Sequence, residues 1–150
     1  MSCDPDVYHP LAEEYQKEMS KAKHPAKMWV AFPEFPFDAP NPIEISHYVK
    51  QAEKELAEAG FTGSVQLMAG HSLGGVMAQK YATKNADKIQ GLMLMGSVLE
   101  RGNHKINDDG TTHFKFNVPT LTMGGSKDGL MRITRVAESW YHQVENIEEA

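Results

Sequence analysis

Short apolar runs alternate along this chain with longer amphipathic segments, and this alternation constrains the fold more than any other feature. The runs are continuous rather than alternating with polar residues, which predicts strands that are covered on both faces. We expect strands at 28–32, 64–70, 88–97 and 118–125. We expect helices at 6–22, 43–59, 73–85 and 130–143. The order predicts an α/β fold with a mostly parallel sheet of about four strands and helices on both faces.

Two segments interrupt the alternation. Residues 33–42 (PEFPFDAPNP) hold four prolines and predict an irregular loop. Residues 98–117 are polar, with NDDGTT as a turn and no strong helix. Gly60 is expected to end the second helix as a cap. Because no linker, repeat or low-complexity tract divides the sequence, we expect a single domain over residues 1–150.

Composition excludes several classes of partner. The formal net charge of −5, without a basic run, gives no electrostatic footprint for nucleic acid. Cys3 is the only cysteine, so an internal disulfide is impossible and a reducing, cytoplasmic compartment is the simplest expectation. No apolar run approaches the roughly 18–20 residues of a membrane span. The sequence leaves the oligomeric state open.

The sequence GHSLGG at 70–75 lies where a predicted strand passes into a predicted helix. It fits G-x-S-x-G, in which a sharp turn exposes a serine for nucleophilic attack. Gly70 and Gly74 would give the room that a strained backbone at Ser72 needs. The N–H of Leu73, at the start of the helix, would point at a developing oxyanion. The alternative is an ordinary turn in which the serine is incidental.

The stretch LMAGHSLGGVMAQKYA closely resembles the nucleophile elbow of α/β-hydrolases, a fold of many esterases, lipases and thioesterases. VPTLTMGGSKDGL resembles the seventh strand of that fold and the loop carrying its acid. The resemblance implies a serine hydrolase of carboxylic esters or thioesters, acting on a small-molecule ester or lipid-like substrate. It implies that Ser72 is the nucleophile and that Asp128 is the acid of a Ser-His-Asp triad. From the residues alone, Asp128 could equally be a turn aspartate in KDG.

The histidine of such a triad is difficult to find. In the family it follows the acid, and only His142 does so here, inside a predicted helix. We interpret His142 as a packing or surface residue. His71 belongs to the elbow, where histidine is common in the family but is not the base. The other histidines have no motif around them and are His9, His24, His47, His104 and His113.

Other parts of the family pattern are also missing. DPDVYHPLAEEYQKEM resembles the family's first helix and KMWVAFPEF its fourth strand, so strands one to three, the eighth strand and the oxyanion loop have no counterpart. We therefore expect a central fragment of the fold that is inactive by itself. Without the third strand, 28–32 must pair directly with 65–69, or the chain is a piece of a longer protein.

Two other functions stay open at this point, a non-catalytic α/β-hydrolase-like binding protein or truncated gene product, and an acyltransferase. Neither a metal-ligand spacing nor a phosphate-binding or dinucleotide-binding motif occurs in the sequence, so we expect no cofactor and no metal.

Overall fold

The computed structural model describes most of the chain. The described residues are 5–36, 41, 43–100, 104–106, 112–114 and 118–145. They belong to two compact units, Met1–Gly63 and Ser64–Ala150, each of which is described by itself.

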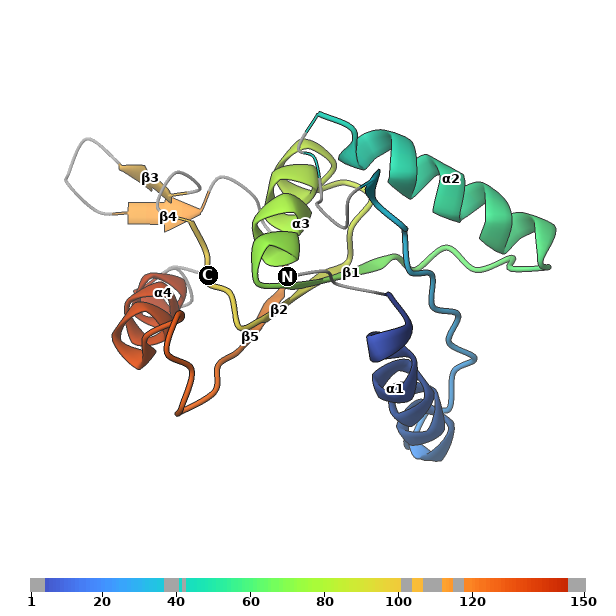
Figure 1. Ribbon diagram of the computed structural model, residues 1–150, viewed down its shortest axis with the longest axis horizontal. Helices are drawn as coiled ribbons and strands as arrows, with labels where there is room; N and C mark the ends of the chain where they lie inside the picture. The colour runs from blue at the N-terminus through green and yellow to red at the C-terminus, as the bar shows by residue number, and fades with distance from the viewer. Residues whose placement is uncertain are drawn as a thin grey trace. The chain divides into compact units, whose positions relative to one another are not determined.

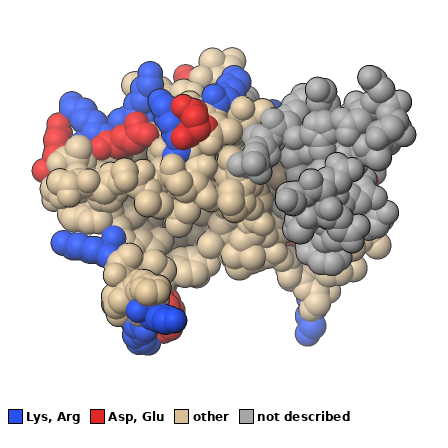
Figure 2. Space-filling view, turned by 180° about the vertical axis from the view of Figure 1, so that it is seen from behind, with Lys and Arg blue, Asp and Glu red and all other residues tan. Residues whose placement is uncertain are grey.

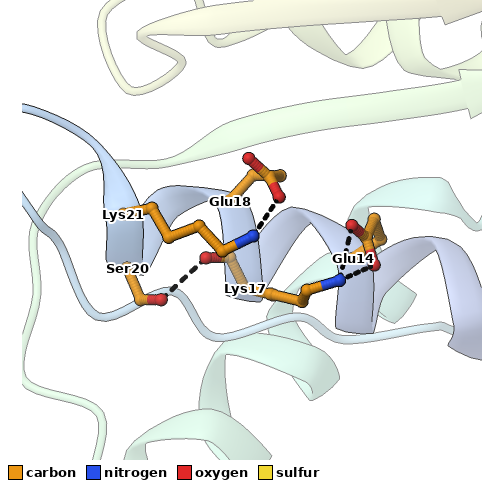
Figure 3. A network of polar contacts seen from close by, with 5 residues as sticks. All are labelled: Glu14, Lys17, Glu18, Ser20 and Lys21. Atoms are coloured by element: carbon orange, nitrogen blue, oxygen red, sulfur yellow. Dashed lines mark hydrogen bonds and ion pairs between the residues drawn. The ribbon is translucent and has the colours of Figure 1, made fainter.

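The first unit is helical. A 3-10 turn, η1 (Pro5–Tyr8), leads into α1 (His9–Lys21), and α2 (Ile45–Glu58) follows after a long connection (Figure 1). Two exposed ion pairs with i,i+3 spacing run along α1, with Lys17 2.9 Å from Glu14 and Lys21 2.6 Å from Glu18 (Figure 3). Pairs of this exposed kind contribute well under about 1 kcal/mol each. Both helices occur where the sequence predicts them.

The end of α2 is also where the sequence predicts it. Gly60 has a φ of +100°, a conformation that glycine adopts without steric cost. The N–H of Gly60 donates to the carbonyl of Ala57 at 3.0 Å, and that of Phe61 donates to Leu56 at 2.8 Å. These two bonds make a Schellman motif, which satisfies the last carbonyls of the helix.

The predicted strand at 28–32 is wrong, because these residues form no strand in the structure. The carbonyl of Met28 accepts a hydrogen bond from the side-chain amide nitrogen of Gln16 at 3.0 Å. In a strand, this carbonyl would instead accept a hydrogen bond from the backbone of a neighbouring strand. Phe32 stacks on Tyr8, with ring centroids 6.5 Å apart. Among the described residues, the segment pairs with neither 64–70 nor any other strand. It is held by helix side chains and aromatic contacts instead.

The second unit contains a three-stranded parallel sheet in the order β1-β2-β5. The strands are β1 (Leu67–His71), β2 (Gly91–Met95) and β5 (Thr120–Met123). Three of the four predicted strands are confirmed, so the sheet is smaller than expected by one strand. In the register, His71 lies opposite Met95, which lies opposite Met123. All three strands therefore end at one edge of the sheet.

Two helices pack in this unit. Helix α3 (Leu73–Lys84) contacts β1 and β2 (Figure 1), and α4 (Ile133–Glu145) follows β5. Leu94 on β2 and Ala82 on α3 are fully buried. Burial is deepest on the middle strand, where Leu92 and Leu94 are covered, whereas Leu67 on β1 and Leu121 on β5 are more than half exposed. The burial of apolar surface on β2 is a main source of stability for such a sheet.

The polar segment 98–117 holds an antiparallel pair that the sequence analysis missed, β3 (His104–Ile106) with β4 (Thr112–Phe114). Strands of three residues carry too little periodicity to be recognised. The predicted turn NDDGTT lies almost wholly outside the described residues.

Figure 2 shows Lys and Arg side chains next to Asp and Glu side chains on the face drawn there, as expected for a mixed-charge surface. In the part of the chain that the structure describes, none of the helices has the length and apolar character needed to cross a membrane.

Candidate functional site

Ser72 is the single residue between β1 and α3. Its φ is 51° and its ψ is −120°, and among the described residues it is the one non-glycine residue with a positive φ. The backbone is held there because the Ser72 N–H donates to the carbonyl of Met95 at 2.9 Å, one step beyond the β1–β2 ladder. The residue as a whole is exposed. The prediction of a strained serine at a strand-to-helix turn is confirmed.

Two positions of this turn require glycine, but they are not the two that the motif suggested. A Cβ on Gly70 would collide with the backbone of Gly74 and Gly75, so the first turn of α3 passes directly over Gly70. A Cβ on Gly75 would lie 2.5 Å from Oγ of Ser97. A Cβ on Gly74 would meet nothing within 4 Å. The expected role of Gly74 in giving room is therefore wrong. Glycine is needed instead at position 75, where α3 lies close to Ser97, the second residue after β2.

Leu73 is the first residue of α3, and half of its surface is exposed. The first N–H groups of a helix have no intrahelical acceptor and lie at the positive end of the helix dipole. The structure therefore leaves a backbone donor directly after Ser72, as the sequence predicts.

A buried glutamine connects α3 to the segment that follows β2. Gln79 is completely buried, and its amide nitrogen donates to Val98 O at 2.8 Å and to Gly75 O at 3.2 Å. Its amide oxygen accepts from the N–H of Glu100 at 2.8 Å. These bonds hold the middle of α3 against residues 98–100, which follow β2. The sequence analysis missed Gln79, and its position inside an otherwise apolar helix stretch was the available signal.

Asp128 lies in the loop that follows β5, and therefore at the same sheet edge as Ser72. Its Oδ1 accepts hydrogen bonds from the N–H groups of Leu130 and Met131, both at 2.9 Å. These bonds match the turn-aspartate alternative, and they also fix the orientation of the carboxylate. No hydrogen bond joins the side chains of Ser72 and Asp128 in the described part of the chain, as predicted.

The pKa of Asp128 is lowered from its ordinary value. The largest causes are the hydrogen bonds from the Met131 and Leu130 N–H groups, which favour the charged form. Partial burial acts in the opposite direction and raises the pKa, and the charge of His71 adds a smaller lowering. Asp128 is therefore held as a carboxylate at neutral pH.

His71 lies at the same sheet edge as Asp128, because it is the last residue of β1, the strand on the other side of β2. A Cβ built on Gly96 would lie 3.3 Å from Nε2 of His71 and 3.5 Å from Oδ2 of Asp128. The imidazole and the second carboxylate oxygen therefore both lie near Gly96, the residue that follows β2. No local sequence pattern predicts that these two residues lie near each other, because they are far apart in the chain.

The remaining histidines are dispersed. His9, on α1, lies against Phe32 with ring centroids 5.2 Å apart, and His47, on α2, lies against Tyr48 at 5.6 Å. His24 follows α1 in the same unit. His104 and His113 lie on β3 and β4, and His142 lies within α4 as predicted. The side chains of these last three are outside the described residues.

Nothing in the described ranges gathers three or more His, Cys, Asp or Glu side chains where they could hold a metal ion. An open hollow next to the Asp128 loop is lined by Leu130, Met131, Arg132 and Arg135.

A family model described as "Alpha/beta hydrolase family" matches residues 41–146. The match covers more than half of the chain, from the residues before α2 to the end of α4, and includes both Ser72 and Asp128. No curated protein and no solved structure matches the chain. The parallel sheet, the strand-to-helix turn at Ser72 and the family match agree: this chain belongs to the alpha/beta hydrolase family.

Proposed function

We propose that this chain carries the nucleophile and the acid of a serine hydrolase that cleaves carboxylic esters or thioesters. Ser72 is the nucleophile and Asp128 is the acid. The observation that carries the proposal is the exposed serine, held at a positive φ on the sheet edge where Asp128 also lies. A strained backbone at an exposed hydroxyl has a cost that an ordinary turn would avoid.

The reaction forms and breaks bonds in two stages. The Oγ of Ser72 attacks the carbonyl carbon of the substrate, and a histidine takes the hydroxyl proton. The tetrahedral intermediate collapses, and the alcohol or thiol leaves with that proton. Water then attacks the acyl-enzyme in the same way and releases the acid. Asp128 holds the tautomer of the histidine and stabilises its protonated form.

The negative charge of the intermediate needs a donor that is already in place. The N–H of Leu73 follows the nucleophile directly and lies at the N-terminus of α3. Its position supports a role as one oxyanion donor. Removing one such donor costs roughly 10²–10³-fold in rate in other serine hydrolases.

A fluorophosphonate probe tests the nucleophile. The probe phosphorylates an activated serine and needs no deacylation, so it reports on Ser72 even where turnover is slow. Positioning and oxyanion donors alone leave roughly 10³–10⁴-fold of rate enhancement when triad members are removed. We therefore expect selective labelling of Ser72 in long incubations, located by peptide mapping.

Two variants control this labelling experiment. Ser72→Ala should lose the label, and Ser126→Ala, at an exposed serine in the Asp128 loop, should keep it. Circular dichroism checks that each variant is folded. A folded chain that stays unlabelled, or that is labelled equally in Ser72→Ala, would overturn the assignment of the nucleophile and favour a binding function.

A further inference from the structure

An open hollow lies beside the loop that holds Asp128. It has a volume of about 270 Å³ and is lined by Leu130, Met131, Arg132 and Arg135. The backbone N–H groups of Leu130 and Met131 donate to Oδ1 of Asp128, both at 2.9 Å. Two residues that line the hollow therefore also fix the carboxylate, so the hollow begins directly at the proposed acid. Its volume suits a small chemical group rather than a whole drug-sized ligand.

The hollow is positioned by the packing of α4 as well as by the loop. A Cβ on Gly124, the residue after β5, would lie 3.0 Å from Cγ2 of Val136, so the first turns of α4 lie against the end of β5. Farther along the helix, the buried hydroxyl of Ser139 accepts a hydrogen bond from the N–H of Leu99 at 3.1 Å. These two contacts hold the helix that carries Arg135 at the carboxyl edge of the sheet.

Two arginines bring positive charge to the hollow. Arg132 directly precedes α4, and its carbonyl accepts from the N–H of Arg135 at 2.8 Å, so the two residues have the i,i+3 spacing that places side chains on one helix face. Both are exposed, and within the described ranges neither guanidinium makes a hydrogen bond or an ion pair. A guanidinium stays protonated at any ordinary pH, and its planar fork of N–H donors matches the oxygens of a carboxylate or phosphate. Two such charges outweigh that of Asp128, so the hollow favours an anion.

We propose that Arg132 and Arg135 bind an anionic group of the substrate, a carboxylate or a phosphate, so that the site takes acidic esters or thioesters. This inference rests on the proposed function, because it names the substrate class of the same site. Leu130 is 88% exposed and supplies apolar surface beside the arginines for the carbon chain that carries the anion. A histidine between Ser72 and Asp128 spans roughly 8 Å, so several bonds separate the anionic group from the carbonyl that is cleaved.

Titration with simple anions tests the binding site without catalysis. Glutarate and inorganic phosphate are the two probes, and glutaramide is the uncharged control. The ionic strength is kept constant with sodium chloride, because salt screens exposed charges. ¹H–¹⁵N spectra of the arginine side chains report binding. We expect saturable shifts of the Nε–H signals of Arg132 and Arg135 with the anions and none with glutaramide. The probe that binds more tightly identifies the anionic group.

Substitutions assign the two signals and measure each contribution. Arg132→Gln and Arg135→Gln should each weaken binding by about threefold to tenfold, because each removes charged donors from an exposed site. Lys127→Gln is the matched control, since this exposed cation belongs to the same loop but does not line the hollow. It should change the dissociation constant by less than about twofold. Circular dichroism checks that each variant is folded.

Three results of the titration would overturn the anion site. The first is the absence of saturable shifts of the two arginine signals in the folded wild-type chain. The second is equal binding of glutaramide, which would assign the hollow to apolar contact. The third is an equal loss of affinity in Lys127→Gln, which would reduce the effect to the general charge of the loop.

A second measurement connects the hollow to the substrate. Two fluorophosphonates of equal length, one ending in a carboxylate and the other in a methyl ester, should label Ser72 at different rates. We expect the carboxylate probe to be faster by at least about threefold in the wild-type chain, and this preference to disappear in the double variant Arg132→Gln/Arg135→Gln. Equal rates in the wild-type chain would overturn the substrate class.

The two measurements separate this inference from the proposed function. If neither fluorophosphonate labels Ser72, the assignment of the nucleophile fails and the substrate class fails with it. The titration then still decides whether the two arginines bind an anion. If Ser72 is labelled and the titration shows no anion binding, the nucleophile stands and the anion site is wrong.

Discussion

Gly75 should tolerate a methyl group much less well than its neighbour Gly74 in the GHSLGG turn. A Cβ at Gly75 would lie 2.5 Å from Oγ and 2.6 Å from Cβ of Ser97, and 3.2 Å from the carbonyl of Gly70. Ser97 is 1% exposed, so it has no free space into which to move. Overpacking of this kind costs about 1–3 kcal/mol.

Gly74→Ala is the matched control for Gly75→Ala. Both positions lie in the first turn of α3, so the gain from replacing glycine in a helix, roughly 0.5–1 kcal/mol, is common to both variants. The difference in unfolding free energy between them therefore isolates the collision, and should be about 1–3 kcal/mol in favour of Gly74→Ala.

Urea denaturation measures this difference. With a slope of roughly 2 kcal/mol per molar, the midpoint of Gly75→Ala should lie about 0.5–1.5 M below that of Gly74→Ala. Adding Ser97→Gly removes the two nearest atoms and should recover part of the loss, with a coupling energy above about 0.5 kcal/mol. Equal midpoints for the two single variants would refute the close approach of α3 to β2 at Gly75.

Three further predictions follow from the same site. Gln79→Leu leaves the buried partners of the amide unpaired and should cost about 2–4 kcal/mol in urea denaturation, whereas exposed Gln51→Leu should stay within about 0.5 kcal/mol. The lowered pKa of Asp128 adds stability above the unfolded-state value of 3.8 that is lost as pH falls through the folded value. The stability difference between wild type and Asp128→Asn should therefore shrink on acidification toward pH 3. Lastly, p-nitrophenyl ester turnover should not exceed that of Ser72→Ala, since no histidine is assigned as the base. Ester turnover by the wild-type chain that is lost in Ser72→Ala would show that a histidine of this chain acts as the base.

The elements with strong local signals could be predicted from the sequence. Apolar runs gave the three strands of the sheet, and helical spacing gave the four helices to within a few residues. The turn at Ser72 was predictable because its geometry depends on adjacent residues, a strand end and a glycine at position 70. The cap at Gly60 was predictable for the same reason, since the Schellman bonds join residues of one helix end.

The features that sequence reasoning missed depend on distant partners. Residues 28–32 have the composition of a strand, but a strand exists only where a neighbouring strand supplies hydrogen bonds. The need for glycine at position 75 rather than 74 comes from Ser97, more than twenty positions away. The position of His71 and Asp128 on either side of Gly96 requires the strand order of the sheet. No local pattern contains these pairings.

The strand order also bears on the proposed pairing of Asp128, in the loop after β5, with Ser72, directly after β1. Neighbouring strands lie about 4.8 Å apart, so the ends of β1 and β5 are separated by roughly 10 Å across β2. A histidine bridging serine and acid spans two hydrogen bonds of about 2.8 Å each and the width of its ring, which is less than this separation. The loop after β5 makes up the difference, because it returns Oδ2 of Asp128 to a position over Gly96, at the end of the middle strand. In the proposed triad, the path of the loop after β5 therefore sets the distance between acid and nucleophile as much as the strand order does.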